Sequence, residues 1–144
     1  QIYQSPGYVV IQSEMIHSAR IIPVDGRPHL GKTLRQWQGD ARGHWEGNVL
    51  VVETINFRND EGATYQNANA DSFRLVERFT RLGADRIDYE FTVSDPATWA
   101  RSWTARIPWK TADGEIYEYA CREGDLDIFH LLQIARKGEK TREQ

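Results

Sequence analysis

The chain has 144 residues, a mixed composition and a formal net charge of −3 at pH 7. That length fits one domain with its own hydrophobic core. The slightly acidic balance argues against sequence-independent binding of DNA or RNA, which needs clustered Lys and Arg, and no apolar run approaches the ~20 residues of a membrane span.

Short runs of alternating apolar and polar residues, separated by turn residues, predict an antiparallel β structure. Residues 31–38 are ambiguous between a loop and a short strand. The fifteen residues from 58 to 72 lack periodicity and are typical of a lid or binding loop. The predicted strands are 1–4, 8–15, 19–24, 49–57, 73–81, 86–94, 99–109 and 115–122.

The end of the chain changes period. Apolar residues recur at helical spacing from Leu126 to Ala135, with Asp125 or Asp127 as N-cap and Gly138 as the stop. The sequence therefore predicts one all-β domain over 1–138, as a lipocalin-like antiparallel β-barrel or a strongly bent sheet. One C-terminal α-helix, 125–137, is expected to pack outside the barrel or over one end, followed by a charged tail, 139–144.

Two glutamates interrupt apolar strand faces. Glu53 shares its alternation with the apolar odd-numbered residues of 49–57, and Glu77 shares its alternation with those of 73–81. Arg101 interrupts the tryptophan-bearing face of 99–109 in the same way. An isolated buried charge is very costly, so each must be paired, protonated or facing a cavity. We expect these three side chains to converge inside the barrel.

This convergence has a functional and a structural interpretation. In the first, the two carboxylates share a cavity, one has a raised pKa, and they serve as catalytic acid and base or as a ligand anchor. In the second, they form a buried salt bridge with Arg101 that has no catalytic role. A local bulge that turns a glutamate outward is a further alternative.

His17 lies between Glu14 and Arg20 near a predicted bend. An imidazole titrates near neutral pH, so His17 is a candidate general base or proton shuttle, and the alternative is a hydrogen-bonded structural histidine. Cys121, the only cysteine, excludes an internal disulfide and is a weaker candidate nucleophile beside His17. No histidine or cysteine spacing predicts a metal site, and no Gly-rich loop predicts a nucleotide cofactor.

Aromatic residues supply further candidates for a binding site. The tryptophans of 99–109 alternate as core residues do. The residues expected to line a pocket mouth or to stack on a sugar or an aromatic ligand are Trp37, Trp45, Tyr65 and Tyr119. Together with Arg101, Glu14 and Arg20, they form the predicted ligand-binding set.

Several segments of the chain resemble a known family. The matching stretches are 8–11, 14–29, 39–47, 75–81, 95–99 and 117–121, which read YVVI, EMIHSARIIPVDGRPH, GDARGHWEG, LVERFTR, DPATW and YEYAC. They resemble the C-terminal half of an uncharacterised family of exported bacterial proteins found in soil and environmental genomes. The resemblance implies a periplasmic or extracellular location and a preceding N-terminal part, and it brings no catalytic residues.

The first residue, Gln1, already lies in a predicted strand. Because an open sheet edge favours pairing with another strand, we expect 1–4 or 8–15 to pair with a strand from an N-terminal piece or from a second copy, as in a homo-oligomer.

The main functional expectation is the binding of a small apolar or aromatic molecule, or a glycan fragment, in a polar-lined β-barrel cavity. One alternative is an acid/base enzyme, such as a lyase, isomerase or hydrolase, that uses the same cavity. Another is a structural subunit that a second chain completes. A buried, unpaired glutamate would favour the enzyme, a glutamate–arginine network would favour binding or pure structure, and a large exposed edge would favour assembly.

Overall fold

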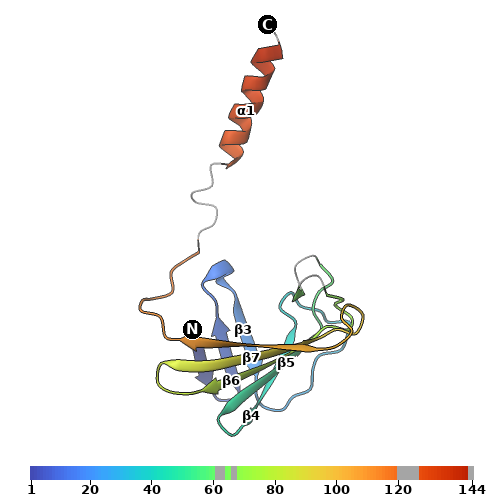
Figure 1. Ribbon diagram of the computed structural model, residues 1–144, viewed down its shortest axis with the longest axis vertical. Helices are drawn as coiled ribbons and strands as arrows, with labels where there is room; N and C mark the ends of the chain where they lie inside the picture. Colours follow the sequence, from blue (N-terminus) through green and yellow to red (C-terminus); the bar gives the residue numbers. More distant parts are fainter. Residues whose placement is uncertain (61–63, 66–67, 120–126, 143–144) are drawn as a thin grey trace.

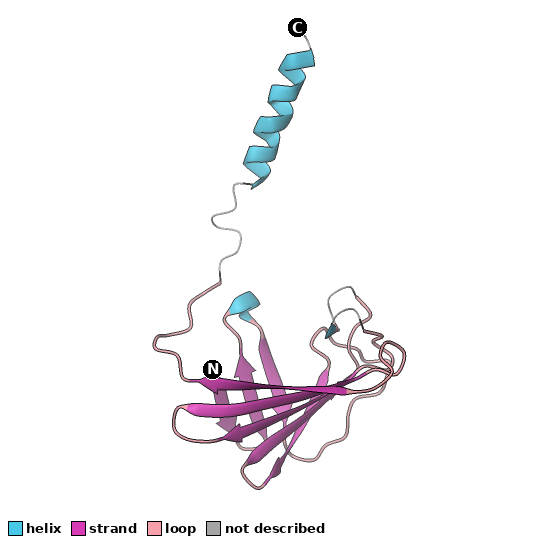
Figure 2. Ribbon diagram, in the orientation of Figure 1, coloured by secondary structure: helices cyan, strands magenta, loops and turns pink. Residues whose placement is uncertain are grey.

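The computed structural model describes residues 1–60, 64–65, 68–119 and 127–142. Strands dominate it, with one α-helix at the C-terminal end (Figure 2). The prediction of a mostly β chain with one C-terminal helix is confirmed. The elements are β1 (Ile2–Ser5), β2 (Tyr8–Gln12), the 3₁₀ turn η1 (Met15–His17), β3 (Ala19–Pro23), β4 (Asp40–Glu46), β5 (Val49–Ile55), β6 (Arg74–Arg81), β7 (Arg86–Ser94), β8 (Trp103–Lys110) and α1 (Asp127–Arg142).

The strands form two antiparallel sheets in chain order, β1-β2-β3 and β4-β5-β6-β7-β8. The larger sheet curves around the smaller one, and β3 lies next to β4 without pairing to it (Figure 1). No closed barrel forms among the described strands, so the lipocalin-like arrangement stays a prediction. The expectation of an outside partner for 8–15 is wrong for β2, because β1 and β3 pair with its two edges.

Two hydrophobic clusters make up the core. The first lies between the sheets and contains Val9, Ile22, Ala41, Leu50, Val52 and Phe79. The second contains Phe57, Ala68, Ala70, Phe73 and Val93. Ala68 and Ala70 belong to the aperiodic segment 58–72, so this part of the segment is packed in the core.

Buried Asp95, which directly follows β7, connects the segment 58–72 to the end of that strand by hydrogen bonds. Its carboxylate accepts hydrogen bonds from Asn69 N at 2.7 Å, Ser72 Oγ at 2.5 Å and Ala97 N at 3.0 Å. Burial alone would raise the pKa of Asp95, but the hydrogen bonds outweigh burial and lower the pKa to about 2. The segment has no apolar periodicity that could hold it on the sheet. Hydrogen bonds to ionised Asp95 hold it there instead.

The C-terminal part differs from the prediction in three respects. Residues 115–119, expected in a strand, are irregular, and Cys121 lies outside the described residues. Helix α1 continues through Gly138 to Arg142, past the predicted stop and into the predicted tail. It stands apart from both sheets (Figure 1), with Phe129 and Leu132 exposed. Its apolar residues end at Ala135, so the stripe offers little area for packing.

We predict that Gly39→Ala destabilises the fold by about 1–3 kcal/mol more than Gly47→Ala does. Both glycines have positive φ, +70° and +61°, so the two variants share the backbone strain. A Cβ at Gly39 would lie 2.6 Å from Thr54 Cγ2 and 2.9 Å from Ile55 O, whereas one at Gly47 would meet nothing within 4 Å. Urea unfolding of the two variants measures the difference, and equal losses would contradict the crowding at Gly39.

Asp95→Asn is expected to lower the free energy of unfolding by about 1–3 kcal/mol at about pH 6. Because the folded pKa lies below the unfolded value of about 3.9, ionised Asp95 stabilises the fold above that pH, and this stabilisation is lost as the pH falls through about 2. The gap to the wild type should therefore shrink in urea titrations at about pH 2.5. Exposed Asp113→Asn is the control, and a gap independent of pH would refute the role of the charge.

Candidate functional site

The pairing of β5 with β6 separates the two glutamates. Val52 stands opposite Glu77, and Val76 stands opposite Glu53. Directly paired residues share a face, so Glu77 faces the smaller sheet and Glu53 lies on the outer face. The expected convergence of these carboxylates is wrong. In β5 the even-numbered residues are also apolar and buried, so alternation alone did not identify the inner face.

Glu77 is the buried acid of the inner face, with 3% of its side chain exposed. Arg20 Nη1 donates to Oε1 at 3.0 Å, and Arg20 Nη2 donates to Oε2 at 2.5 Å. Tyr89 O–H donates to Oε1 at 2.8 Å, and Thr54 Oγ1 lies 3.4 Å from Arg20 Nη2. Because Arg20 belongs to β3 and the other three residues belong to the larger sheet, this inner network connects the two sheets.

Electrostatics keeps the inner network in one protonation state. Burial lowers the pKa of Arg20, but its hydrogen bonds to Glu77 and the glutamate charge outweigh burial and raise that pKa above its usual value. Burial raises the pKa of Tyr89, and the neighbouring charge of Glu77 raises it further. Arg20 therefore stays charged, Tyr89 stays a neutral donor, and the Arg20–Glu77 pair carries no net charge.

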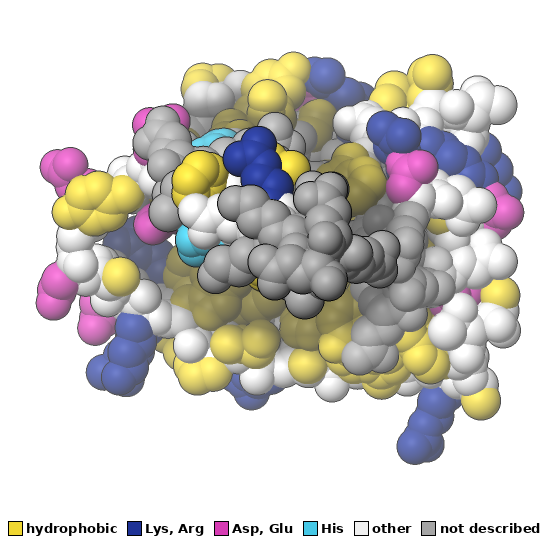
Figure 3. All heavy atoms as spheres, turned by 90° about the horizontal axis from the view of Figure 1, so that it is seen from above, with side chains coloured by type: hydrophobic (Ala, Val, Ile, Leu, Met, Phe, Trp, Pro, Cys, Tyr) yellow, Lys and Arg dark blue, Asp and Glu magenta, His cyan; other side chains and the backbone are white. Residues whose placement is uncertain are grey.

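Aromatic rings surround the inner network on β7 and β8. Tyr89 stacks on Phe79 at 4.9 Å and on Phe91 at 5.6 Å, and its centroid lies 4.6 Å from that of Trp109. Phe91 and Trp109 are half-buried. Seen from above, apolar side chains gather across the lower part of the view (Figure 3). We name the inner-face set of Tyr89, Phe91, Trp103, Ile107 and Trp109 the aromatic trough.

Arg20 retains unused hydrogen-bonding capacity. A guanidinium has five N–H donors, and the bonds to Glu77 and Thr54 use three of them. The Nε–H is buried and has no acceptor among the residues that the structure describes. A buried unsatisfied donor costs about 1–3 kcal/mol. With 22% of its side chain exposed, Arg20 is the member of the buried ion pair that a ligand can reach.

Glu53 belongs to a second polar cluster, on the outer face. Arg74 Nη2 donates to its carboxylate at 2.5 Å, and His29 Nε2 lies 3.7 Å from Oε1. The hydrogen bond from Arg74 lowers the pKa of Glu53 below its usual value. His29 Nδ1 lies 2.9 Å from the carboxylate of buried Asp40, which also accepts from Leu30 N at 2.8 Å. This arrangement orients the imidazole.

His29 lies in the loop between β3 and β4, and Asp40 is the first residue of β4. The outer cluster joins residues 29, 40, 53 and 74, whose separations match no ligand or catalytic spacing, so no local signal indicates it.

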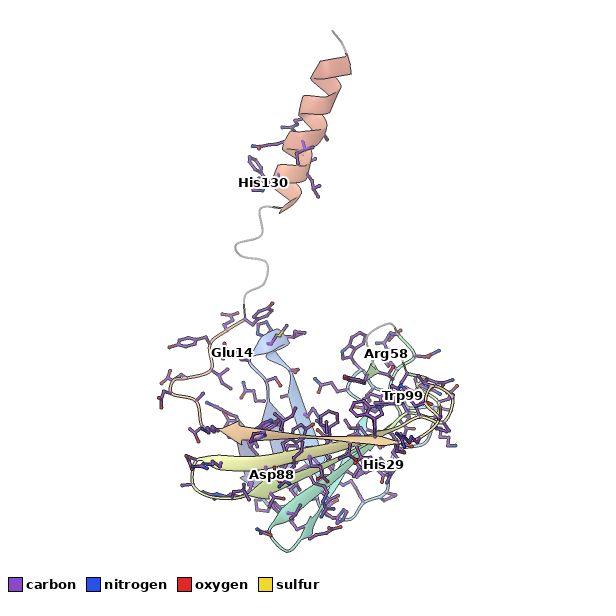
Figure 4. The ribbon with its side chains drawn as sticks, in the orientation of Figure 1. Glu14, His29, Arg58, Asp88, Trp99 and His130 are labelled. Atoms are coloured by element: carbon purple, nitrogen blue, oxygen red, sulfur yellow. The ribbon has the colours of Figure 1, made fainter. Side chains whose placement is uncertain are left out.

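Three other predicted site residues lie at a different place. Glu14 and His17 line a pocket of about 340 Å³ together with Tyr117 and Glu118, and the His17 ring lies 6.3 Å from that of Tyr119. Figure 4 shows Glu14 beside η1, and His29 at the opposite end of the sheets. The predicted site residues therefore lie at separate places. His17 belongs to η1, which lies outside the core between the two sheets.

The remaining predicted site residues differ in how close they lie to the inner network and the aromatic trough. Tyr65 packs edge-on against Trp103, 5.4 Å between centroids, and so adjoins the aromatic trough. Trp37 and Trp45 are half-exposed and contact no other aromatic ring of the described residues. Arg101 is exposed in the turn before β8, so its predicted convergence with Glu77 is wrong, and Arg20 takes that place.

Comparisons with protein-family models, curated proteins and solved structures gave no match. Family membership therefore stays a prediction. Within the described residues, no three His, Cys, Asp or Glu side chains are grouped so that they could hold a metal ion. In the same part of the chain, α1 falls short of the length and hydrophobicity that a membrane-crossing helix needs.

We predict that Glu77→Leu destabilises the protein by ~3–5 kcal/mol, because Arg20 is left as an uncompensated charge. The double variant Arg20→Met/Glu77→Leu should recover much of this loss, since neither charge then remains. Glu53→Gln, which breaks a half-exposed pair, is the control and should cost under about 1 kcal/mol. Urea unfolding measures these three and the single variant Arg20→Met, and a double variant whose loss equals the sum of the two single losses would contradict the coupling.

Proposed function

We propose that the protein binds a small apolar or aromatic molecule, or a glycan fragment, on its inner face, and that it does so as an exported protein in the periplasm or outside the cell. The ligand would lie along the aromatic trough and meet Arg20 at its polar end. The observation that carries this proposal is the Arg20 guanidinium, which has unused donors beside half-buried aromatic rings. The proposed location rests on the family resemblance.

The trough has the composition of a small-molecule site. Such sites combine apolar and aromatic walls with a few polar groups that orient the ligand. Ile107, on the inner face of β8, is 46% exposed. Single exposed apolar residues are ordinary, whereas adjoining ones mark a place where something binds. Tyr65 at Trp103 extends this surface with a ring that has a polar edge.

The inner network favours binding over acid/base catalysis. A catalytic acid or base must be able to exchange its proton with a substrate. Glu77 is buried, and its carboxylate accepts hydrogen bonds from both Arg20 and Tyr89. It is therefore a structural anion that positions Arg20, and the unpaired glutamate that the enzyme alternative requires is not found on the described inner face.

A pair of variants on one strand tests this proposal. The probe is N-phenylnaphthylamine, a neutral aromatic amine whose fluorescence rises in apolar surroundings. Ile107 faces the trough, and exposed Thr104 lies on the other face of β8. We expect Ile107→Glu to weaken probe binding roughly tenfold or more, because it places a charge against the bound ring, and Thr104→Glu to leave binding unchanged. Absence of probe binding to the wild type, or equal effects of both variants, would refute the proposal.

A second candidate function is assembly with another chain. Among the described strands, β1 and β8 each pair on one side only. All four residues of β1 are exposed, and an open edge favours pairing with a further strand. The partner would be a second copy or an N-terminal segment. Native mass spectrometry separates the candidates: a monomer that retains a small molecule supports binding, and a ligand-free oligomer supports assembly.

A further inference from the structure

We infer that the ligand of the inner site is electrically neutral and presents a hydrogen-bond acceptor, such as a ketone, ester or ether oxygen, to Arg20. This inference rests on the proposed binding function and specifies its ligand class. It follows from the donors that remain on Arg20, from the charge of the inner network and from which partner is exposed.

The groups that a ligand meets at this site are donors. After the bonds to Glu77 and Thr54, Arg20 still has its Nε–H and one N–H on Nη1. The O–H of Tyr89 is already donated to Glu77. The acceptor of the network, Glu77, is 3% exposed and lies beneath Arg20. Because the Nε–H is buried, the donor for a ligand oxygen is the remaining N–H on Nη1.

The charge of the inner network argues against an anionic ligand. The charges of Arg20 and Glu77 sum to zero. The two hydrogen bonds between them, at 3.0 and 2.5 Å, pair the guanidinium charge with the glutamate charge. A ligand carboxylate at Arg20 would place a second anion within a few ångströms of Glu77, where water is largely excluded and repulsion is strong. The other charged side chain on the inner face of the paired strands, Arg81, lies at the end of β6 and bonds to Gly83 O at 2.9 Å.

A cationic ligand is also disfavoured. It would have to approach Arg20, the exposed member of the pair, to reach the buried carboxylate. Like charges at that distance repel, and the rings of the trough would not compensate, since a cation–π contact contributes only about 0.5–2 kcal/mol. A neutral acceptor gains a hydrogen bond from a charged donor and incurs neither repulsion.

Three naphthalenes with different substituents at one ring position test the inference: acetylnaphthalene, naphthoate and ethylnaphthalene. They share the aromatic surface and differ in acceptor and charge. Quenching of tryptophan fluorescence gives the affinities, because Trp103 and Trp109 lie in the trough. We expect acetylnaphthalene to bind roughly tenfold tighter than either other probe, since a hydrogen bond to a charged donor has that magnitude.

The variant Glu77→Gln gives the sharper result. It removes the compensating anion and leaves Arg20 as a free cation. Naphthoate should then bind at least roughly tenfold tighter than it binds the wild type, while acetylnaphthalene should change little. Glu46→Gln, on the outer face of the β4–β5 hairpin, is the matched control and should change neither affinity. If Glu77→Gln does not fold, Arg20→Lys replaces it, because it removes the guanidinium with its spare Nη1 N–H and should abolish the preference for acetylnaphthalene.

The outcomes separate the inference from the proposed function. Equal binding of all three probes to the wild type, or tighter binding of naphthoate, leaves the binding function intact and overturns the neutral-acceptor inference. Absence of binding by all three removes the proposed function and the inference with it. Unchanged naphthoate affinity in folded Glu77→Gln would overturn the argument from charge.

Discussion

The ion pair between Arg20 and Glu77 is the interaction on which the rest of the structure depends. It connects β3 of the smaller sheet to β6 of the larger one at a point where both side chains are largely removed from water. A buried pair of this kind does little for stability compared with an apolar replacement, but it is costly to break and it admits one arrangement of partners. It also divides the inner face, with Phe79 in the first hydrophobic cluster and Phe73 in the second on either side of Glu77. The pair therefore fixes how the sheets face each other and places a polar group between two apolar regions.

Much of the fold was predictable from the sequence, because strand formation depends on local alternation and turn residues. The prediction for β7 is confirmed at both ends. The face of each strand was harder to assign. In β6 the apolar residues alternate with charged ones, so Glu77 was correctly placed inside. In β5 both faces are apolar, so the position of Glu53 could not be decided from alternation.

The partners of the candidate site could be predicted only in part. A buried glutamate needs a cation, and the sequence indicated that need, but the choice between Arg20 and Arg101 depends on which strand crosses the larger sheet. That is a tertiary contact between residues separated by 57 positions. The outer cluster of His29, Asp40 and Glu53 gave no signal for the same reason. By contrast, Arg20 was in the predicted ligand-binding set, and the structure places it in the inner network with 22% of its side chain exposed.

In the proposed function, one buried pair would support recognition without catalysis. Glu77 fixes the position of the guanidinium through two hydrogen bonds, and Tyr89 donates a further hydrogen bond to the same carboxylate. The remaining N–H groups of Arg20 therefore have a fixed direction before a ligand binds. Such preorganisation lowers the entropic cost of binding. In the proposed site, the aromatic trough would supply contact area and the donors of Arg20 would orient the ligand.

The most direct measurement is proton–nitrogen NMR of the arginine Nε–H groups. The account predicts that Arg20 gives a slowly exchanging Nε–H signal, because this group is buried in the inner network, and that the signal shifts when acetylnaphthalene is added. Exposed Arg101 serves as the internal control, with rapid exchange and no shift. An Arg20 Nε–H that exchanges as fast as that of Arg101 and does not respond to the probe would contradict the account.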